Sequence, residues 1–266
     1  MNNGFLCVSP KVVVVPEGWK HKEKFLELFL AFLKEKPTFP GYYKGAHFRH
    51  ETFLQNYKED VVRVKPKNFQ DDHLEWLVLP NLKPKENGRE LAFTMESFSP
   101  FICFVELPGT KHSQTPSFLK KAASFCNEKL WGNLSCTLII PDEDLSQYEK
   151  EVEETIESIK YGTVGLNIWA VMGFGRGTWG AYGGKGDAKD IQSGQHFVSN
   201  LFLIDNALKT VVRCPLVSRA HANEKLSPTK RLMVISAVAH YYITPTFYNL
   251  SKCFASLLSP FSYVNF

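Results

Sequence analysis

Hydrophobic and polar residues follow two spacings along this chain, and the two spacings divide it into strands and helices. Short apolar runs bounded by proline or glycine are typical of buried strands, whereas apolar residues three or four positions apart indicate amphipathic helices. Strands are expected at residues 12–15, 74–79, 101–107, 135–140, 162–169 and 209–213. Helices are expected at residues 22–34, 42–57, 117–130 and 144–160. Strands that alternate with helices predict an α/β fold with substantial parallel pairing.

The pattern changes after residue 217. Residues 218–266 contain prolines at 228, 245 and 260 and an apolar, aromatic stretch at 229–242 that favours a helix. We therefore expect a main α/β region at residues 1–217 and a C-terminal extension, partly helical, at residues 218–266.

Composition restricts the classes of function. A chain of 266 residues with 44% hydrophobic and 22% charged residues is typical of a globular protein. The net charge is only +4, and the basic clusters are interrupted by acidic and apolar residues, so a nucleic-acid partner is not expected. The longest apolar stretch, at residues 232–243, is shorter than the roughly 20 residues that a membrane span needs. With no secretory signal pattern, a cytoplasmic protein is expected.

The six cysteines include no pair with the CxxC spacing. Neither a disulfide scaffold nor a zinc site is therefore expected, and no metal site is predicted. Cys7 differs from the others because it follows a Gly-containing turn and precedes the buried strand at residues 12–15. Such a thiol is either a buried structural cysteine or a nucleophile whose turn amides stabilise negative charge.

Two further strings carry candidate chemistry. Residues 175–180 match the GxGxxG pattern of dinucleotide sites, but that pattern requires a helix directly after it. Residues 181–186 are too rich in glycine to begin a helix, so we do not expect a dinucleotide site there. Glu96 and Phe98 lie in a turn before a strand. A carboxylate can accept hydrogen bonds from two ribose hydroxyls, and an aromatic ring can pack on a flat ring. Without further context, residues 96–100 indicate only a capped turn.

Taken together, these strings resemble the aldehyde dehydrogenase superfamily. The family motif N-x-G-Q-x-C is matched by Asn2, Gly4 and Cys7, with Phe5 in place of the glutamine. The order of further matches extends the resemblance from residue 2 to about residue 217.

Three of those further matches lie downstream of the cysteine. The motif E-x-F-G-P is matched by residues 96–100, with Ser99 in place of the glycine. The motif G-T-V-x-x-N is matched by residues 162–167, and the K-T-V strand by residues 209–211.

The resemblance implies a three-layer, catalytic-domain-like α/β fold with a mostly parallel twisted sheet. Cys7 would attack an aldehyde and form a thiohemiacetal, and hydride transfer to NAD or NADP would leave a thioester for water to hydrolyse. Glu96 would bind the nicotinamide ribose and Phe98 would position the ring. Asn167 and Trp169 would lie at the end of the substrate-tunnel strand. The strand at 209–213 would join a partner subunit's sheet, giving a homodimer or a higher homo-oligomer.

In this family the Rossmann cofactor domain, a second oxyanion donor and the general base precede the cysteine. We therefore expect a partial chain that lacks the Rossmann domain and is inactive alone. Two alternatives stay open. The chain is a catalytically dead pseudoenzyme or interaction module of the same fold, or Cys7 acts as a cofactor-free esterase. The esterase needs a base, and the sequence nominates none among its eight histidines.

Overall fold

The computed structural model describes residues 2–83, 90–111, 114–175, 177–184, 188–216 and 228–258. The chain forms two compact units, Met1–Leu216 and Val217–Phe266. The predicted boundary lay between residues 217 and 218. None of the helices in the described ranges is long and apolar enough to cross a membrane.

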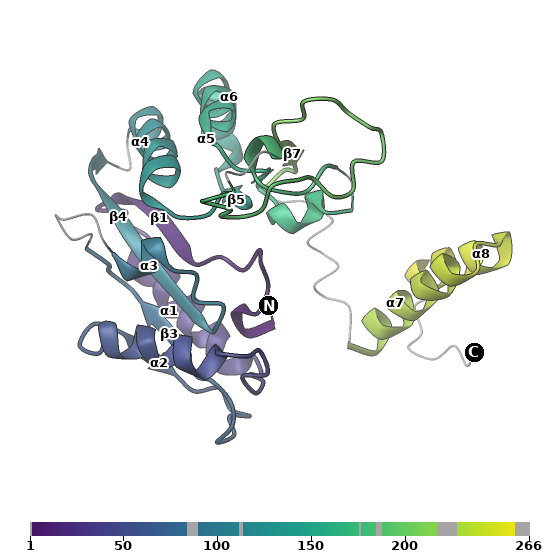
Figure 1. Cartoon of the computed structure of the whole chain (residues 1–266), viewed down its shortest axis with the longest axis horizontal. Coiled ribbons are helices and arrows are strands. Elements are labelled where there is room, and N and C mark those ends of the chain that lie inside the picture. The colour runs from purple at the N-terminus through teal and green to yellow at the C-terminus, as the bar shows by residue number, and fades with distance from the viewer. Residues whose placement is uncertain are drawn as a thin grey trace. The chain divides into compact units, whose positions relative to one another are not determined.

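The first unit contains two separate sheets rather than one (Figure 1). The first sheet has the strand order β1-β4-β3-β2, in which β4 pairs in parallel with β1 and β3, and β2 pairs antiparallel with β3. These strands are β1 (Val12–Glu17), β2 (Val62–Val64), β3 (Trp76–Leu79) and β4 (Phe101–Lys111). The second sheet is wholly parallel, with β5 (Ser135–Leu138), β6 (Thr163–Leu166) and β7 (Thr210–Arg213) in that order.

Helices cover both faces of the first sheet, which produces three layers. Alternate residues of a strand point to opposite faces. In β4, Ile102 and Phe104 pack with apolar side chains of α1, whereas Phe101 and Cys103 pack with those of α2, α3 and α4. The helices are α1 (Lys22–Glu35), α2 (Ala46–Asn56), α3 (Leu91–Thr94) and α4 (Thr115–Lys129).

The second sheet has a core of its own. Val152 and Ile156 of α6 pack with Val164 and Leu166 of β6, and Leu119 of α4 joins them. Helix α4 therefore contributes to both cores and ties the two sheets together. The helices that flank this sheet in sequence are α5 (Asp142–Gln147) and α6 (Glu149–Ser158).

The predicted α/β class and its mostly parallel pairing are confirmed, and several predicted elements differ from the observed ones at their boundaries. The helix expected from residue 42 begins at Ala46, after Gly45 with a φ of 78°. The helix expected at 144–160 is two helices that meet at Tyr148. The strand expected at 162–169 ends at Leu166, because Asn167 has a φ of 55°, which a strand does not accommodate. β2 and α3 were not predicted.

The second unit contains two helices, α7 (Pro228–Ile243) and α8 (Phe247–Leu258). They pack against one another across the short connection at residues 244–246. The sequence predicted a helix at 229–242 but did not predict α8.

Candidate active site around Cys7

Cys7 lies exposed in a turn that its neighbours hold in place. The Ser9 amide donates to the Leu6 carbonyl over 3.0 Å, which closes the turn around Cys7. Just before it, Asn3 and Gly4 have φ values of 48° and 77°, so the chain curls tightly ahead of the thiol. The sequence therefore presents the thiol to solvent and buries the nearby Phe5 and Val8.

Phe5 anchors this turn in an aromatic cluster. Its side chain is 1% exposed. Its ring centroid lies 5.1 Å from that of Tyr42, 5.7 Å from that of Tyr43 and 6.4 Å from that of Phe98. Aromatic pairs at such separations contribute beyond simple burial. The phenylalanine that replaces the motif's glutamine thus fills a hydrophobic site.

Gly4, three residues before Cys7, packs against the backbone of Ser99, the residue that follows Phe98. A Cβ atom on Gly4 would lie 2.2 Å from the Ser99 carbonyl oxygen, which no side chain permits. The two segments are more than 90 positions apart in sequence, and their backbones meet at van der Waals distance. Gly4 is required for this approach.

Lys11 links the two segments electrostatically. Its Nζ donates to the Gly4 carbonyl over 2.9 Å and lies 5.6 Å from the centroid of the Phe98 ring. Burial lowers the pKa of Lys11 to about 8, although the charges of Glu96 and Cys7 act in the opposite direction. The ammonium group is therefore close enough to interact with both the candidate nucleophile and the candidate ribose-binding carboxylate.

Arg49 of α2 holds the backbone of the same segment. Its Nε donates to the Ser97 carbonyl over 3.0 Å and its Nη2 to the Phe98 carbonyl over 3.4 Å. Phe98 has a φ of 36°, a conformation that is costly for a bulky residue and persists only where its surroundings enforce it. Arg49 and the neighbouring ring of Tyr43, 4.9 Å away, provide that constraint.

The Glu96 side chain is exposed at the edge of this cluster. Within the described ranges its carboxylate accepts no hydrogen bond from another residue, so both oxygens are open to a ligand. Phe98 beside it is half-buried, which leaves part of the ring accessible. A carboxylate and a ring face thus lie next to each other on the same segment.

Trp169 also reaches the cysteine turn. Its Nε1 donates to the Val8 carbonyl over 3.1 Å, so the indole lies next to the residue that follows Cys7. Asn167 is placed differently: its side-chain amide accepts from the Ile140 amide at 2.8 Å and donates to the Ile140 carbonyl at 2.9 Å. Both of its polar groups are used inside the fold, and its predicted substrate contact stays a prediction.

The glycine-rich loop is packed against the second sheet. A Cβ atom on Gly162 would lie 1.7 Å from the Gly180 carbonyl oxygen, and one on Gly177 would lie 2.5 Å from the Thr210 methyl group. A short 3₁₀ turn, Tyr182–Gly184, follows in place of the helix that a dinucleotide site needs. These glycines permit close backbone packing, in agreement with the sequence-based rejection of a dinucleotide site.

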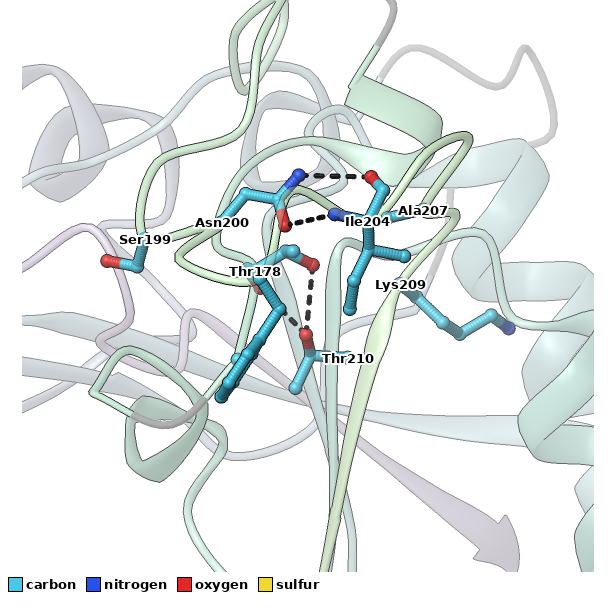
Figure 2. A pocket seen from close by; sticks show the side chains of 9 residues that line it. Thr178, Ser199, Asn200, Ile204, Ala207, Lys209 and Thr210 are labelled. Carbon is cyan, nitrogen blue, oxygen red and sulfur yellow. Dashed lines mark hydrogen bonds between the residues drawn. The ribbon is translucent and has the colours of Figure 1, made fainter.

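A pocket of about 200 Å³ lies beside this loop (Figure 2). Its polar groups bond to one another: the Thr178 and Thr210 hydroxyls are 3.1 Å apart, and the Asn200 amide makes two hydrogen bonds with the Ile204 backbone. None of the predicted site residues lines it. In the described ranges, no group of three or more His, Cys, Asp or Glu side chains is arranged to hold a metal ion.

The sequence interpretation missed Lys11 and Arg49, the two cations that organise the site. Lys11 gave a usable signal, since it is a charged residue directly before the apolar strand at 12–15, where charge is costly unless it has partners. Arg49 gave none, because it lies in an ordinary amphipathic helix and its role depends on how α2 packs.

The comparisons give a likeness of fold. No protein-family model and no curated protein matches the sequence. The NADP-dependent glyceraldehyde-3-phosphate dehydrogenase from Bacillus halodurans C-125, solved in complex with NADP, is similar over 67% of this chain, with 13% identity and a TM-score of 0.51. Aldehyde dehydrogenase 21 from Physcomitrella patens, in complex with the reaction product succinate, is similar over 67% of this chain, with 18% identity and a TM-score of 0.49. The matched region spans about 35% of the length of either protein.

Proposed function

We propose that this chain is the catalytic-domain portion of an aldehyde dehydrogenase-type oxidoreductase, with Cys7 as the nucleophile. The observation that carries the proposal is that the two strings that match the family's motifs, residues 2–7 and 96–100, meet where Gly4 packs against Ser99. The fold likeness to an NADP-dependent dehydrogenase supports it. The matched region spans about a third of that enzyme, so the activity of a whole enzyme is part of the proposal.

Each residue of the cluster has a distinct task. The Cys7 sulfur forms a bond to the aldehyde carbon, and the Cys7 amide holds the resulting oxyanion. Lys11 positions the turn through the Gly4 carbonyl and supplies a positive charge near the thiolate. Trp169 fixes the backbone on the other side of Cys7 and borders the space where the aldehyde enters.

The residues at Glu96 and Phe98 suit one end of a nicotinamide cofactor. The exposed carboxylate would accept the ribose hydroxyls, and the accessible part of the Phe98 ring would lie against the nicotinamide. When bound, NAD or NADP supplies the hydride acceptor of the reaction. Arg49 holds the carbonyls of Ser97 and Phe98, and Lys11 lies over the Phe98 ring, so this end of the site is positioned by the chain's own side chains.

Oligomerisation is part of the same proposal. β7 is the terminal strand of the second sheet within the described part of the chain, so one edge of it pairs with no described strand. An open edge strand readily pairs with another chain. A second copy would add its own strand there, so we expect light scattering to show a homodimer. A protein that is monomeric at all concentrations would contradict this part of the proposal.

Lys11 is a candidate base for the cofactor-free esterase. Because burial lowers its pKa to about 8, a useful fraction of neutral amine exists at mildly alkaline pH. To act as the base for cofactor-free hydrolysis of activated esters, this amine, which donates to the Gly4 carbonyl, would have to move to reach the Cys7 thiol. The base that the sequence did not nominate among the histidines would then be a lysine.

The reactivity of Cys7 tests the proposal. We expect alkylation of the Cys7 peptide by iodoacetamide to slow in Lys11→Met, since the variant removes a nearby positive charge and the hydrogen bond to the Gly4 carbonyl that holds the turn. Lys20→Met, which removes an exposed lysine from the next turn, is the matched control and should not change the rate. A Cys7 rate that is the same in all three proteins favours the pseudoenzyme.

Hydrolysis of p-nitrophenyl acetate separates the esterase from the dehydrogenase. If Lys11 is the base, Cys7→Ser and Lys11→Met both abolish turnover, and the wild-type rate rises with pH through about 8. Ester cleavage that survives Cys7→Ser removes the esterase. For the dehydrogenase we expect the isolated chain to form a covalent adduct with an aldehyde without NAD(P)-dependent turnover.

A further inference from the structure

The helical hairpin of α7 and α8 exposes a broad apolar surface. The two helices bury a few small or flexible side chains against one another, among them Met233, Ala237 and Cys253. On the other side, α7 exposes a continuous stripe of apolar residues at helical spacing: Leu232, Ile235, Val238, Ala239, Tyr242 and Ile243. Apolar residues at such spacing form one face of a helix, and this face is turned away from α8.

Helix α8 also exposes large apolar side chains, beginning at its first residue. Phe247 is 92% exposed, and Tyr248 and Phe254 are also exposed. We call the stripe on α7 the hairpin surface; the exposed aromatic side chains of α8 add to the apolar area that the hairpin presents to water. A soluble surface rarely carries a stripe of this many apolar side chains without a binding role, so the hairpin surface is suited to binding rather than to contact with water.

The charge of this part of the chain identifies the kind of surface it fits. After Glu224 the sequence contains four basic residues, Lys225, Lys230, Arg231 and Lys252, and no acidic residue. Of the 31 basic and 27 acidic residues of the chain, residues 1–224 therefore hold equal numbers and are formally neutral. The whole net charge of +4 lies in residues 225–266.

We propose that the hairpin surface binds to an anionic lipid bilayer, lying in the interface without crossing it. An amphipathic helix with an apolar face, aromatic residues and basic charges is suited to the boundary between headgroups and acyl chains. A second copy would bring two purely basic hairpins together, and the first 224 residues offer no net negative charge. An anionic bilayer complements both the apolar face and the charge.

Vesicle sedimentation of the full chain tests the proposal. Wild-type protein should sediment with vesicles of phosphatidylcholine containing about 30% phosphatidylserine, and several-fold less with phosphatidylcholine alone, because each basic residue near an anionic surface contributes about fivefold. Raising the salt to about 0.5 M should remove most of that difference, since screening shortens the range of the charges.

Two variants separate apolar insertion from charge. The double variant Leu232→Gln/Ile235→Gln should weaken binding at least about tenfold, since it removes two apolar side chains without changing charge. His240→Gln, an exposed change on the same helix outside the stripe, should leave binding within about twofold. Because all three positions are exposed, far-UV circular dichroism and the melting temperature should stay at their wild-type values.

Three results would overturn the proposal. One is the absence of wild-type sedimentation with anionic vesicles, which decides the question even if the double variant does not fold. Another is equal sedimentation of the double variant and the wild type. The third is a wild-type oligomer that the double variant dissociates while vesicle binding is absent, which would assign the hairpin surface to a second copy.

Discussion

The sheet cores of the first unit and the α7–α8 hairpin place similar residues in opposite environments, although the first unit also has exposed apolar side chains such as Phe48 and Phe202. In the first unit, phenylalanines such as Phe53, Phe101 and Phe104 are almost completely buried between sheet and helices. In the hairpin, Phe247 and Phe254 are exposed. The first unit mixes acidic and basic residues, whereas the hairpin region has basic residues alone. Burial requires layers on both sides of an element, and two helices provide only one shared face.

This difference teaches where the stability of the chain resides. Sheets covered on both faces remove apolar surface from water, and burial of this kind is the main favourable contribution to folding. The hairpin removes little and leaves its larger side chains for another surface. The same substitution should therefore have a large effect in the first unit and a small one in the hairpin.

The largest expected effect is on a core phenylalanine. Phe101 is 1% exposed, and its ring centroid lies 4.4 Å from that of Phe53. Phe101→Ala should lower the free energy of unfolding by about 3–5 kcal/mol, because it leaves a cavity between β4 and α2. Phe254→Ala on α8, 58% exposed, should change it by less than about 0.5 kcal/mol. Urea unfolding followed by circular dichroism measures both, and similar losses would contradict the contrast.

Asparagine provides a second paired test. Asn167→Ala removes both hydrogen bonds to Ile140 and leaves buried backbone groups unpaired, so we expect a loss of about 2–4 kcal/mol. Asn249→Ala removes an exposed bond to the Thr244 carbonyl between α7 and α8 and should cost no more than about 1 kcal/mol. If Asn167→Ala unfolds no more easily than wild type, its amide is not structural and the predicted substrate role gains weight.

Lysine gives a third, smaller contrast. Lys209 donates to the carbonyls of Ile156, Glu157 and Ile159, and thus caps the C-terminal end of α6. Lys209→Met should lower the melting temperature by an amount equivalent to about 1–3 kcal/mol, because charged donors at a helix C-terminus stabilise it. Lys252→Met on α8 removes a cation that lies over the Tyr248 ring and should cost no more than about 1 kcal/mol. Equal melting temperatures would argue against the cap.

The smallest effect concerns pH. Folding lowers the pKa of Lys11 from 10.5 to about 8, so between these values the unfolded chain binds more protons than the folded one. The free energy of unfolding therefore increases with pH in this range. Below about pH 8 the folded protein buries a charged Lys11, and the full destabilisation from that burial is present. Relative to Lys11→Met, the wild type should gain about 1 kcal/mol between pH 7 and pH 9. Parallel stability curves for the two proteins would show that Lys11 is not buried as described.

The sequence predicted the elements of the first unit well, because their apolar spacing is set by burial on a sheet or a helix. The run at residues 12–15 and the helix at 22–34 needed no other information. Element boundaries such as Tyr148 and Asn167 depend on local backbone geometry that spacing does not encode. α8 was missed because apolar residues lie on its exposed face as well as its buried face. The spacing of apolar and polar residues that indicates an amphipathic helix is therefore lost.

For the site, the sequence supplied the strings but not their connections. Cys7 and Glu96 were named from motifs, and their proximity depends on the packing of Gly4 against Ser99. Lys11 and Arg49 donate hydrogen bonds to backbone carbonyls of the two strings. Every residue has a backbone carbonyl, so the sequence does not indicate which carbonyls are bonded.

Because Gly4 contacts Ser99, the reactivity of Cys7 can report on what binds near Glu96. Because no space separates the backbones of Gly4 and Ser99, a displacement of the Glu96–Phe98 segment by a few tenths of an ångström must also displace the turn that carries Cys7. A nucleotide that occupies the Glu96 end would therefore change the rate at which Cys7 is alkylated, without touching the sulfur. A single thiol-labelling assay would then report the occupancy of a site whose residues, Glu96 and Phe98, lie far from Cys7 in the sequence.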